Sequence, residues 1–308
     1  MFSAVSCGSG CHNHICVSVM QIYNRRTGAC FEEKEYGAGA LKFLYQTFVG
    51  RCLLKTIVAR PWFSRWRARY QRSARSGKKI VPFVEKYGVD MTAWRGEEFA
   101  SFQEFFTRAK NYATRAAEQE LIAVADSKLA VYDIREDMTL KIKRCVYSLE
   151  EILQDGELAR KYAKGSCLVF RLSVDDYHRY VYPDAGRCMR SWRIGGELHT
   201  IRPISEKYHV YCRNCREVSV LATEHFGEVT QIEVGALLVG KINNHGAKEF
   251  VRLQEKGYFD YGGSTIVLLI GEGIEIDEDI RQQSANGIET QVHIGEKIGI
   301  CKERIGDK

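Results

Sequence analysis

The sequence has few of the features that mark membrane-spanning, disordered or disulfide-stabilised proteins. Its 308 residues include only four prolines and no low-complexity tract, which argues against long disordered regions. It has no run of 18 apolar residues, since the best candidate, residues 43–59, contains Arg51 and Lys55. A transmembrane helix is therefore excluded. The length is sufficient for one large or two small globular domains.

The cysteines also lack the pattern of a disulfide framework. There are eleven, an odd number, scattered over a long chain, whereas disulfide-rich secreted domains are short. Cys and His residues crowd residues 1–19 without the paired spacing of a closed zinc site, and we expect this segment to be a disordered leader. Cys212 and Cys215 have a redox-like spacing but no second pair. We expect reduced thiols and no metal site.

Acidic residues are absent from Tyr36 to Val84, and this absence defines a basic region. The same stretch carries eleven Lys and Arg residues, more than the net charge of +6 of the whole chain, so the remainder is mildly acidic. Trp62, Phe63 and Trp66 lie among these cations, a mixture typical of an element in a membrane interface. Composition alone equally allows a solvated basic helix packed on its own domain. Nucleic acid would also be attracted, but no nucleic-acid-binding motif is present.

Helical patterns come first along the chain, and strand patterns follow. The predicted helices are residues 40–59, 62–75, 101–109 and 148–164. The predicted strands are residues 166–174, 193–204, 217–222, 229–242 and 264–270. This order predicts an α+β protein. It consists of a basic helical region over residues 20–115 and a β-rich body over residues 116–308.

Three segments have residue types suited to catalysis, and each also has an ordinary structural explanation. Residues 258–269 by themselves predict a hairpin with a turn at Gly262-Gly263. His178 follows a predicted strand beside Asp and Arg, which suits a general acid or base but equally a structural histidine. Asp126 can orient a histidine, although an Asp that caps a turn is commoner.

Taken together and in this order, the motifs resemble the phosphatidylserine decarboxylase family. The variant of the family with Gly-Gly-Ser-Thr at its processing point is the closer form, and the resemblance runs from about Gln21 to Gly299. The matching motifs are Ser101-Phe-Gln-Glu-Phe-Phe-Thr-Arg108, Ala125-Asp126, Tyr147-Ser-Leu149, Arg171-Leu172, Asp176-Tyr-His-Arg179, Arg213-Asn214, Val234-Gly-Ala-Leu-Leu-Val-Gly240, Lys256-Gly-Tyr-Phe259 and Gly262-Gly-Ser-Thr265.

The resemblance implies a proenzyme that cuts itself between Gly263 and Ser264. The β chain would be residues 1–263 and the α chain residues 264–308, and the two would remain associated. The Ser264 hydroxyl would attack the Gly263 carbonyl, and elimination would then convert Ser264 into a pyruvoyl group, the self-generated cofactor. Glycines tolerate the strained turn that this step needs, and the serine needs a neighbouring base.

The implied reaction converts phosphatidylserine into phosphatidylethanolamine and CO2. The pyruvoyl ketone condenses with the serine amine and accepts the electrons that the departing carboxylate releases. Asp126 matches the family's relay carboxylate, and His178 matches the histidine expected to transfer protons. The family commonly has a second histidine three residues later, where this chain has Val181. Either His178 serves both steps, or another histidine reaches the site, for which His199 is the candidate.

The resemblance also favours the membrane interpretation of the basic region, because phosphatidylserine lies in an anionic membrane. Each Lys or Arg near such a surface contributes about 1 kcal/mol. We expect peripheral binding through residues 41–70 at the cytoplasmic face of the cell membrane, a homodimer, and no nucleic-acid partner. Two alternatives stay open: an unprocessed, inactive lipid-binding homologue, which Val181 does not exclude, and a pyruvoyl decarboxylase for another amine headgroup or a free amino acid.

Overall fold

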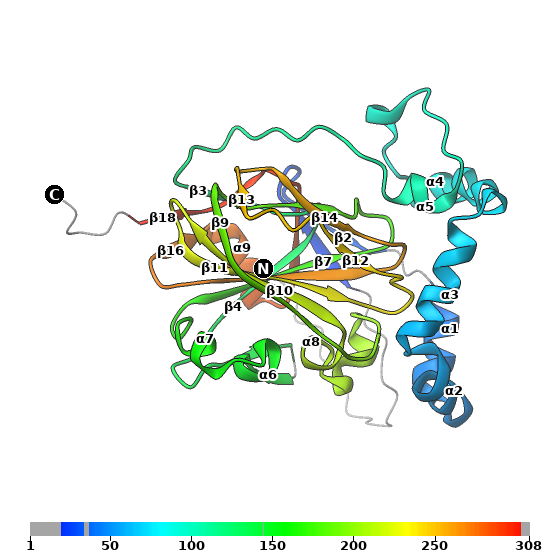
Figure 1. Cartoon of the computed structure of the whole chain (residues 1–308), viewed down its shortest axis with the longest axis horizontal. Helices are drawn as coiled ribbons and strands as arrows, with labels where there is room; N and C mark the ends of the chain where they lie inside the picture. Colours follow the sequence, from blue (N-terminus) through cyan, green and yellow to red (C-terminus); the bar gives the residue numbers. More distant parts are fainter. Residues whose placement is uncertain (1–19, 34–36, 144, 303–308) are drawn as a thin grey trace, which may run out of the picture.

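The computed structural model describes residues 20–33, 37–143 and 145–302, so the leader expected at residues 1–19 lies outside the described part. As the sequence predicts, the fold is mixed α and β with a β-rich body (Figure 1). No helix in the described ranges has both the length and the apolar composition needed to cross a bilayer.

The helices form two main groups (Figure 1). The first group lies at one end of the body and contains α1 (Ala38–Gln46), α2 (Phe48–Leu53), the π-helical turn η1 (Leu54–Val58), α3 (Pro61–Gln71), η2 (Ala74–Lys79), α4 (Ile80–Tyr87), η3 (Thr92–Trp94) and α5 (Phe102–Phe106). The second group covers one face of the main sheet and contains α6 (Leu149–Leu153), α7 (Gly156–Arg160), η4 (Pro203–Tyr208) and α8 (Val210–Arg213). A further helix, α9 (Glu278–Ala285), packs against strand β4, residues Ser127–Asp133.

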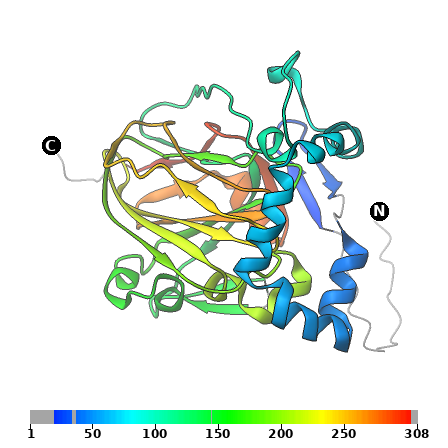
Figure 2. The ribbon, with the colours of Figure 1, turned by 45° about the vertical axis from the view of Figure 1, so that its right-hand side comes forward.

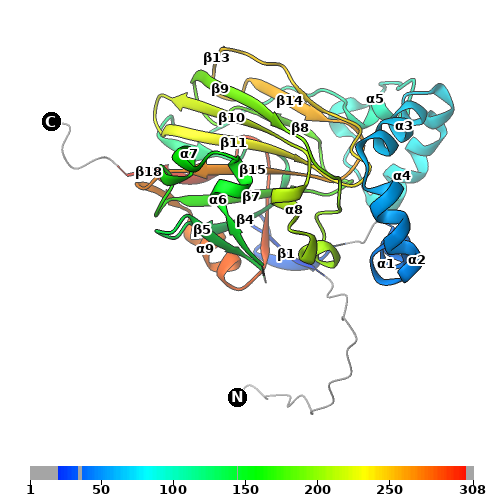
Figure 3. The same cartoon turned by 60° about the horizontal axis from the view of Figure 1, so that its bottom comes forward.

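The body is built on a ten-stranded sheet, and Figure 3 shows its strand order from β13 to β4. All its neighbouring strands are antiparallel except β1 and β17. In spatial order the strands are β13 (Glu249–Phe250), β9 (Gly186–Ile194), β10 (Arg216–Thr223), β11 (Gly227–Gly235), β15 (Ser264–Ile270), β7 (Ser166–Leu172), β4, β17 (Glu289–Val292), β1 (Gln21–Asn24) and β2 (Ala29–Glu32).

Three smaller sheets complete the body. One has the order β12 (Ile242–Asn244), β14 (Glu255–Phe259) and β8 (Arg179–Val181). The others are β16 (Ile274–Ile276), β18 (Lys297–Cys301) and β3 (Glu120–Ile122), and the pair β5 (Thr139–Ile142) and β6 (Cys145–Ser148).

The central strands of the large sheet are covered on both faces, which explains their nearly continuous apolar sequence. Every residue of β7 and β15 is buried. Ile266 and Leu268 belong to a core shared with the small sheets, whereas Val267 and Leu269 belong to the core under α6, α7 and α8. Successive strand residues point to opposite faces. The end of β15 is therefore held firmly within the body.

The predicted helix over residues 40–59 is divided in the structure. Thr47 ends α1 in an extended conformation, and its hydroxyl caps α2 by accepting from the Gly50 backbone at 3.0 Å. A side-chain oxygen that captures a free N–H in this way starts a new helix. The predicted break before Pro61 is confirmed, because α3 begins at that proline. The predicted helix over residues 148–164 is likewise split, into α6 and α7.

The strand predictions fail where side chains replace ladder hydrogen bonds. Residues 193–204 and 229–242 are not single strands, since β9 ends at Ile194 and β11 ends at Gly235. The Asn214 side chain accepts from the His199 backbone and donates to the carbonyls of His199 and Gly235. These bonds satisfy the backbone without a neighbouring strand.

The start of the predicted helical region is also wrong. Residues 21–24 and 29–32 form the antiparallel pair β1 and β2 at one edge of the large sheet. β1 pairs in parallel with β17, whose residues lie more than 260 positions away in the chain. Such a distant pairing leaves no local periodic signal in a four-residue strand.

Candidate active site

Residues 260–263, which we call the corner, connect two different sheets. β14 pairs with β12 and β8, whereas β15 pairs with β7 and β11. The corner therefore carries the chain from a three-stranded sheet into the middle of the ten-stranded sheet. The hairpin interpretation of this segment is wrong, because β14 and β15 are not hydrogen-bonding neighbours.

The two glycines of the corner meet different constraints. Gly262 has a φ of 144°, and a Cβ built there would lie 2.8 Å from the backbone nitrogen of Val239. That position therefore requires glycine. At Gly263 the nearest described atom to a Cβ would be the Leu172 carbonyl oxygen at 3.5 Å, an ordinary contact. The need for glycine thus holds at Gly262, while the structure leaves room for a side chain at Gly263.

Ser264 is the first residue of β15 and is fully buried. Its backbone pairs with Leu172 of β7 and Gly235 of β11, so strands on both sides fix its position. Its Oγ has no hydrogen-bond partner among the described residues. Leaving a buried hydroxyl unpaired costs about 1–3 kcal/mol, and native proteins contain few such groups. The neighbouring Thr265 hydroxyl is also buried and unpaired, so what makes Ser264 the candidate nucleophile is its place directly after Gly263.

His178 is also fully buried and also has a free polar atom. Its Nδ1 lies 2.8 Å from the Asp176 carbonyl oxygen. Because a carbonyl can only accept, Nδ1 carries the proton and Nε2 carries the lone pair. Nε2 has no hydrogen-bond partner in the described part of the chain. Burial lowers the pKa of His178 from 6.5 to about 3, against smaller opposing effects of the Asp176 and Gly262 backbones. The imidazole is therefore neutral.

Aromatic contacts link the His178 ring to the corner. The ring centroid lies 4.3 Å from that of Phe106 in α5, and Phe106 packs against the Tyr261 ring at 5.1 Å. The backbone N–H of Phe259 donates to the His178 carbonyl at 3.1 Å. The first helix group therefore supplies one wall of the site.

A buried ion pair holds the loop that precedes His178. Lys128 Nζ lies 2.7 Å from both carboxylate oxygens of Asp176, which also accepts from the Ser173 backbone at 2.7 Å. Burial lowers the pKa of Lys128, but the nearby carboxylates outweigh burial and raise it. Lys128 is therefore a charged anchor of the loop.

A second buried group of charges lies beside this loop. Arg171 contacts Glu33 at 3.0 Å and Glu289 at 2.6 Å. Burial raises the pKa of Glu33, but Arg171, Lys128 and Arg202 outweigh it and bring the pKa to about 2. Sequence reasoning missed this group. The sequence signal that could have revealed it is Arg171, a charged residue inside an apolar strand pattern. Lys, Arg and Glu are almost never fully buried without partners.

Asp126 is paired with Lys110 rather than with His178. Its Oδ2 lies 2.6 Å from Lys110 Nζ, and its Oδ1 accepts from the Ile294 backbone at 2.8 Å. The histidine within ion-pair reach is His293, whose Nδ1 lies 3.9 Å from Oδ1. The sequence analysis did not single out either Lys110 or His293.

The strand order explains why Asp126 lies apart from Ser264. β7 lies between β15, which carries Ser264, and β4, which follows Asp126. At the usual strand spacing the two backbones are about 10 Å apart. Val181 is fully buried, and its backbone N–H donates to the Val124 carbonyl at 3.0 Å. The side chain of a valine has no atom that can carry a proton.

His199 has no free ring nitrogen. Nδ1 lies 3.2 Å from the Tyr45 hydroxyl, and Nε2 lies 3.0 Å from the Glu197 carboxylate. The ring also stacks on Tyr208 with centroids 4.3 Å apart. The structure therefore gives His199 the contacts of a structural histidine and does not bring it together with Ser264.

A cavity of about 190 Å³ lies between α1 and the corner. Leu41 and Leu44 of α1 line one side, and Gly262 and Gly263 line the other. Arg202 is among the few charged residues of an otherwise mainly apolar lining. Figure 2 shows α1 and α3 standing alongside this end of the β body. The corner is thus accessible from the helical side.

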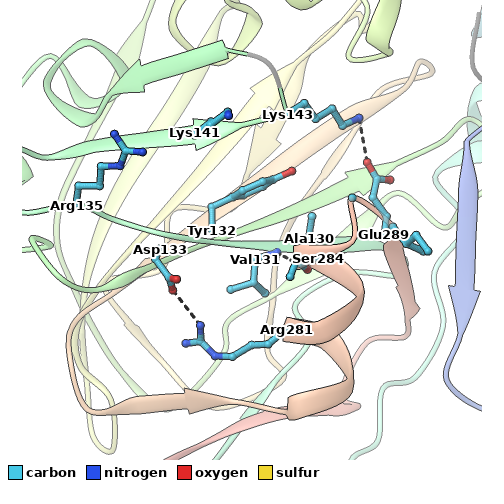
Figure 4. Close-up of a pocket in the computed structure, with 13 residues that line it drawn as sticks. Ala130, Val131, Tyr132, Asp133, Arg135, Lys141, Lys143, Arg281, Ser284 and Glu289 are labelled. Atoms are coloured by element: carbon cyan, nitrogen blue, oxygen red, sulfur yellow. Dashed lines mark hydrogen bonds and ion pairs between the residues drawn. The ribbon is translucent and has the colours of Figure 1, made fainter.

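A larger cavity, of about 570 Å³, lies between α9 and the strands β4 and β5, and contains neither His178 nor the corner (Figure 4). Its basic residues are partly neutralised, since Arg281 pairs with Asp133 at 2.9 Å and Lys143 with Glu289 at 3.3 Å. No group of three His, Cys, Asp or Glu side chains in the described ranges is placed to hold a metal ion.

The sequence pattern of the phosphatidylserine decarboxylase family matches residues 102–300, more than half of the chain. A relative from Clostridium acetobutylicum, named phosphatidylserine decarboxylase proenzyme 2, is 50% identical over 90% of this chain and 97% of its own length. This chain belongs to the phosphatidylserine decarboxylase family. Relatives named phosphatidylserine decarboxylase proenzyme from Ruminiclostridium cellulolyticum and Fusobacterium nucleatum are 39% and 35% identical, over 93% and 91% of this chain and 99% and 97% of their own lengths.

The likeness to phosphatidylserine decarboxylases extends beyond the matched pattern. That pattern includes His178 and Ser264 but begins only at α5. Because the Clostridium acetobutylicum relative covers 90% of this chain, the similarity continues into the helices before α5. The sequence of the first helix group is therefore matched in this relative.

Proposed function

We propose that this chain decarboxylates phosphatidylserine to phosphatidylethanolamine and CO2 after cutting itself between Gly263 and Ser264. Family membership supports the reaction. The observation that carries the proposal is that two polar atoms are buried and unpaired, Ser264 Oγ directly after the corner and His178 Nε2 on a ring that packs towards it through Phe106. A hydroxyl and a neutral imidazole are the two groups that the first step needs.

In the self-cleavage step the Ser264 Oγ attacks the Gly263 carbonyl carbon while His178 Nε2 takes the hydroxyl proton. The C–N bond breaks, the Ser264 nitrogen leaves as an amine with that proton, and an ester joins the two chains. Removal of the Ser264 α-proton then expels the Gly263 carboxylate and leaves a dehydroalanine, which water hydrolyses to a pyruvoyl group and ammonia. The positive φ of Gly262 lets the backbone adopt the strained turn at which the chain is cut.

The roles of the polar residues follow from their contacts. The Asp176 carbonyl fixes the His178 tautomer, a task that a carboxylate performs in other nucleophile–histidine pairs. His178 serves both self-cleavage and proton transfer in decarboxylation. We propose Asp126 as a positioning residue: it holds Lys110, whose ammonium lies 4.2 Å from the centre of the Tyr177 ring, next to His178.

The pyruvoyl group supplies the ketone that binds the substrate amine and takes up electrons as the carboxylate leaves. The buried, unpaired Ser264 Oγ fits its origin. β15 would become the first strand of the α chain, and it is hydrogen-bonded to β7 and β11 over most of its length. The two chains would therefore stay together after cleavage.

We further propose peripheral docking on an anionic membrane through α1, α2 and α3, at the cytoplasmic face. These helices expose large apolar side chains beside their cations; for example, Phe48, Trp62 and Trp66 are 75%, 52% and 59% exposed. Aromatic rings and cations on one element suit a headgroup layer. The cavity behind α1 reaches the corner, so a lipid held by these helices can reach the scissile bond. A homodimer stays a prediction.

The docking proposal is tested by co-sedimentation with phosphatidylglycerol vesicles. The variant Trp62→Ala/Trp66→Ala should bind at least tenfold more weakly. The matched control Met189→Ala/Val251→Ala removes two exposed apolar residues of the β body and should bind as the wild type does. Equal binding of both variants would rule out this docking face.

Self-cleavage is tested by denaturing electrophoresis and mass spectrometry of the purified protein. Two chains should appear, residues 1–263 and residues 264–308, and the smaller should have a pyruvoyl N-terminus. Ser264→Ala should remain one chain, whereas Thr265→Ala, which removes the adjacent buried and unpaired hydroxyl, should still be cut. A wild-type protein that remains full length would instead support the inactive homologue that Val181 keeps open.

A further inference from the structure

A basic groove of about 640 Å³ lies between α3 and the β body. Five cations line it: Arg65, Arg69 and Arg72 from α3 and its end, Arg193 from β9, and Lys241. Its lining includes no Asp or Glu. It differs in this respect from the cavity of Figure 4, where Asp133 and Glu289 offset the basic residues.

Most of these cations have no ion-pair partner in the described part of the chain. Arg72 pairs with Asp260 at 2.6 Å, but the other four cations form no ion pair with any described residue. Like charges gathered in a concave site raise the local positive potential and concentrate anions there. Guanidinium groups also match the oxygen geometry of a phosphate. The groove is therefore suited to a phosphate-bearing anion.

The remaining lining points to a lipid rather than a small polar anion. Apolar side chains alternate with the cations, including those of Ile194, Leu198 and Val239. Arg65 and Arg69 also line an adjoining surface groove on α3, whose other walls are Ile57, Trp62, Phe63 and Trp66. A molecule with its phosphate in the basic groove can thus lay hydrocarbon along these rings.

We propose that the basic groove binds the headgroup of an anionic phospholipid at an accessory site separate from the substrate. The separation follows from the geometry, because the groove and the cavity at the corner share no lining residue. The lipid would lie beside α3 and hold it against the body, while a different lipid enters behind α1. Binding at the groove does not require self-cleavage.

The site would also adjoin the corner. Arg72 uses one Nη2 bond for Asp260, and a guanidinium has further donors that can reach a phosphate. Asp260 is buried and also accepts from Asn243 at 3.0 Å and Gln103 at 3.3 Å. A headgroup bound to Arg72 would therefore be linked through this side chain to Asp260, the first residue of the corner that leads to Ser264.

The test uses isothermal titration calorimetry of the full chain with dihexanoyl-phosphatidylglycerol below its micelle concentration. Arg193→Gln/Lys241→Gln removes two charges on the body side and leaves the docking helices unchanged. Arg187→Gln/Lys248→Gln is the matched control, because it removes two exposed charges from another part of the body. We expect the wild type and the control to bind equally and the groove variant at least tenfold more weakly.

Three further measurements make the result decisive. The variant Arg65→Gln/Arg69→Gln alters the other wall of the groove and should show the same loss of affinity. Agreement between the two variants would exclude misfolding of one of them as the cause. Zwitterionic dihexanoyl-phosphatidylcholine should bind at least tenfold more weakly than the anionic lipid. Equal affinity in the groove and control variants would overturn the site. Displacement of the lipid by an equal concentration of inorganic phosphate would overturn the lipid assignment and indicate a site for soluble anions.

Discussion

The surroundings of His178 and of His199 differ in the partners of their ring nitrogens. Both side chains are buried, and burial lowers the pKa of both imidazoles. At His199 a tyrosine hydroxyl and a carboxylate occupy the two ring nitrogens. At His178 a backbone carbonyl occupies Nδ1, and Nε2 has no hydrogen-bond partner among the described residues.

This difference shows that burial alone does not identify a base. A neutral imidazole with one fixed N–H and one vacant nitrogen can accept a proton at a defined place. An imidazole whose two nitrogens are both bonded must first break a contact. We therefore propose proton transfer for His178 and packing for His199, and the following substitutions can break that proposal.

The largest difference in self-cleavage rate is expected between substitutions of the two histidines. His178→Gln should slow self-cleavage by at least about 100-fold, the lower range for loss of a general base. His199→Gln should leave the rate within about threefold and lower the free energy of unfolding by about 1–3 kcal/mol, because buried hydrogen bonds are lost. Electrophoresis of proenzyme made by cell-free translation gives the rates, and urea denaturation gives the stabilities. The reverse pattern of rates would make His199 the base.

A second large effect is expected at Gly262. Gly262→Ala introduces a Cβ against the Val239 backbone at a positive φ, so it should destabilise the fold by about 1–3 kcal/mol and slow cleavage at least tenfold. Gly263→Ala meets only ordinary contacts and should fold as the wild type does. Thermal unfolding of each variant, combined with Ser264→Ala to keep the chain intact, measures the difference. Equal destabilisation would contradict the distinct roles of the two glycines.

Local features of the site could be read from the sequence because they depend on few neighbouring residues. The cap at Ser101, the break before Pro61 and the strand that begins at Ser264 are all present in the structure. Their signals are a side chain that binds a nearby N–H, a ring that restricts the preceding residue, and a β-branched apolar run.

Features that depend on distant pairings could not be read in this way. The hairpin expected at Gly262-Gly263 became a corner because β14 and β15 find partners in different sheets. The contact of Asp126 with His293 joins residues 167 positions apart. No alternation or spacing in either segment reports the other, so the sequence could not show which histidine lies near Asp126.

A smaller effect is expected at Asp126, if it only positions Lys110. Asp126→Asn keeps the acceptor for the Ile294 backbone and removes the charge, so cleavage should slow by less than tenfold. Lys110→Met, which removes the other charge, should have a similar effect, and the double variant should be no slower than either single one. A loss as large as that of His178→Gln, with Lys110→Met unaffected, would restore Asp126 to a relay.

The smallest expected change is in the pH profile of self-cleavage. With its pKa lowered from 6.5 to about 3 by burial, His178 stays neutral in the folded proenzyme at every pH above about 5. The rate should therefore be constant from pH 5 to 8, whereas a base with the ordinary pKa would lose most of its activity below pH 6. The free energy of unfolding, in contrast, should depend on pH over this range. Below pH 6.5 the histidine takes up a proton in the unfolded state but stays neutral in the folded state, so the contribution of neutral His178 to stability is lost as the pH falls from 6.5 towards 3. A cleavage rate that titrates with a midpoint near 6.5 in a fully folded proenzyme would show that the base is an exposed histidine and not His178.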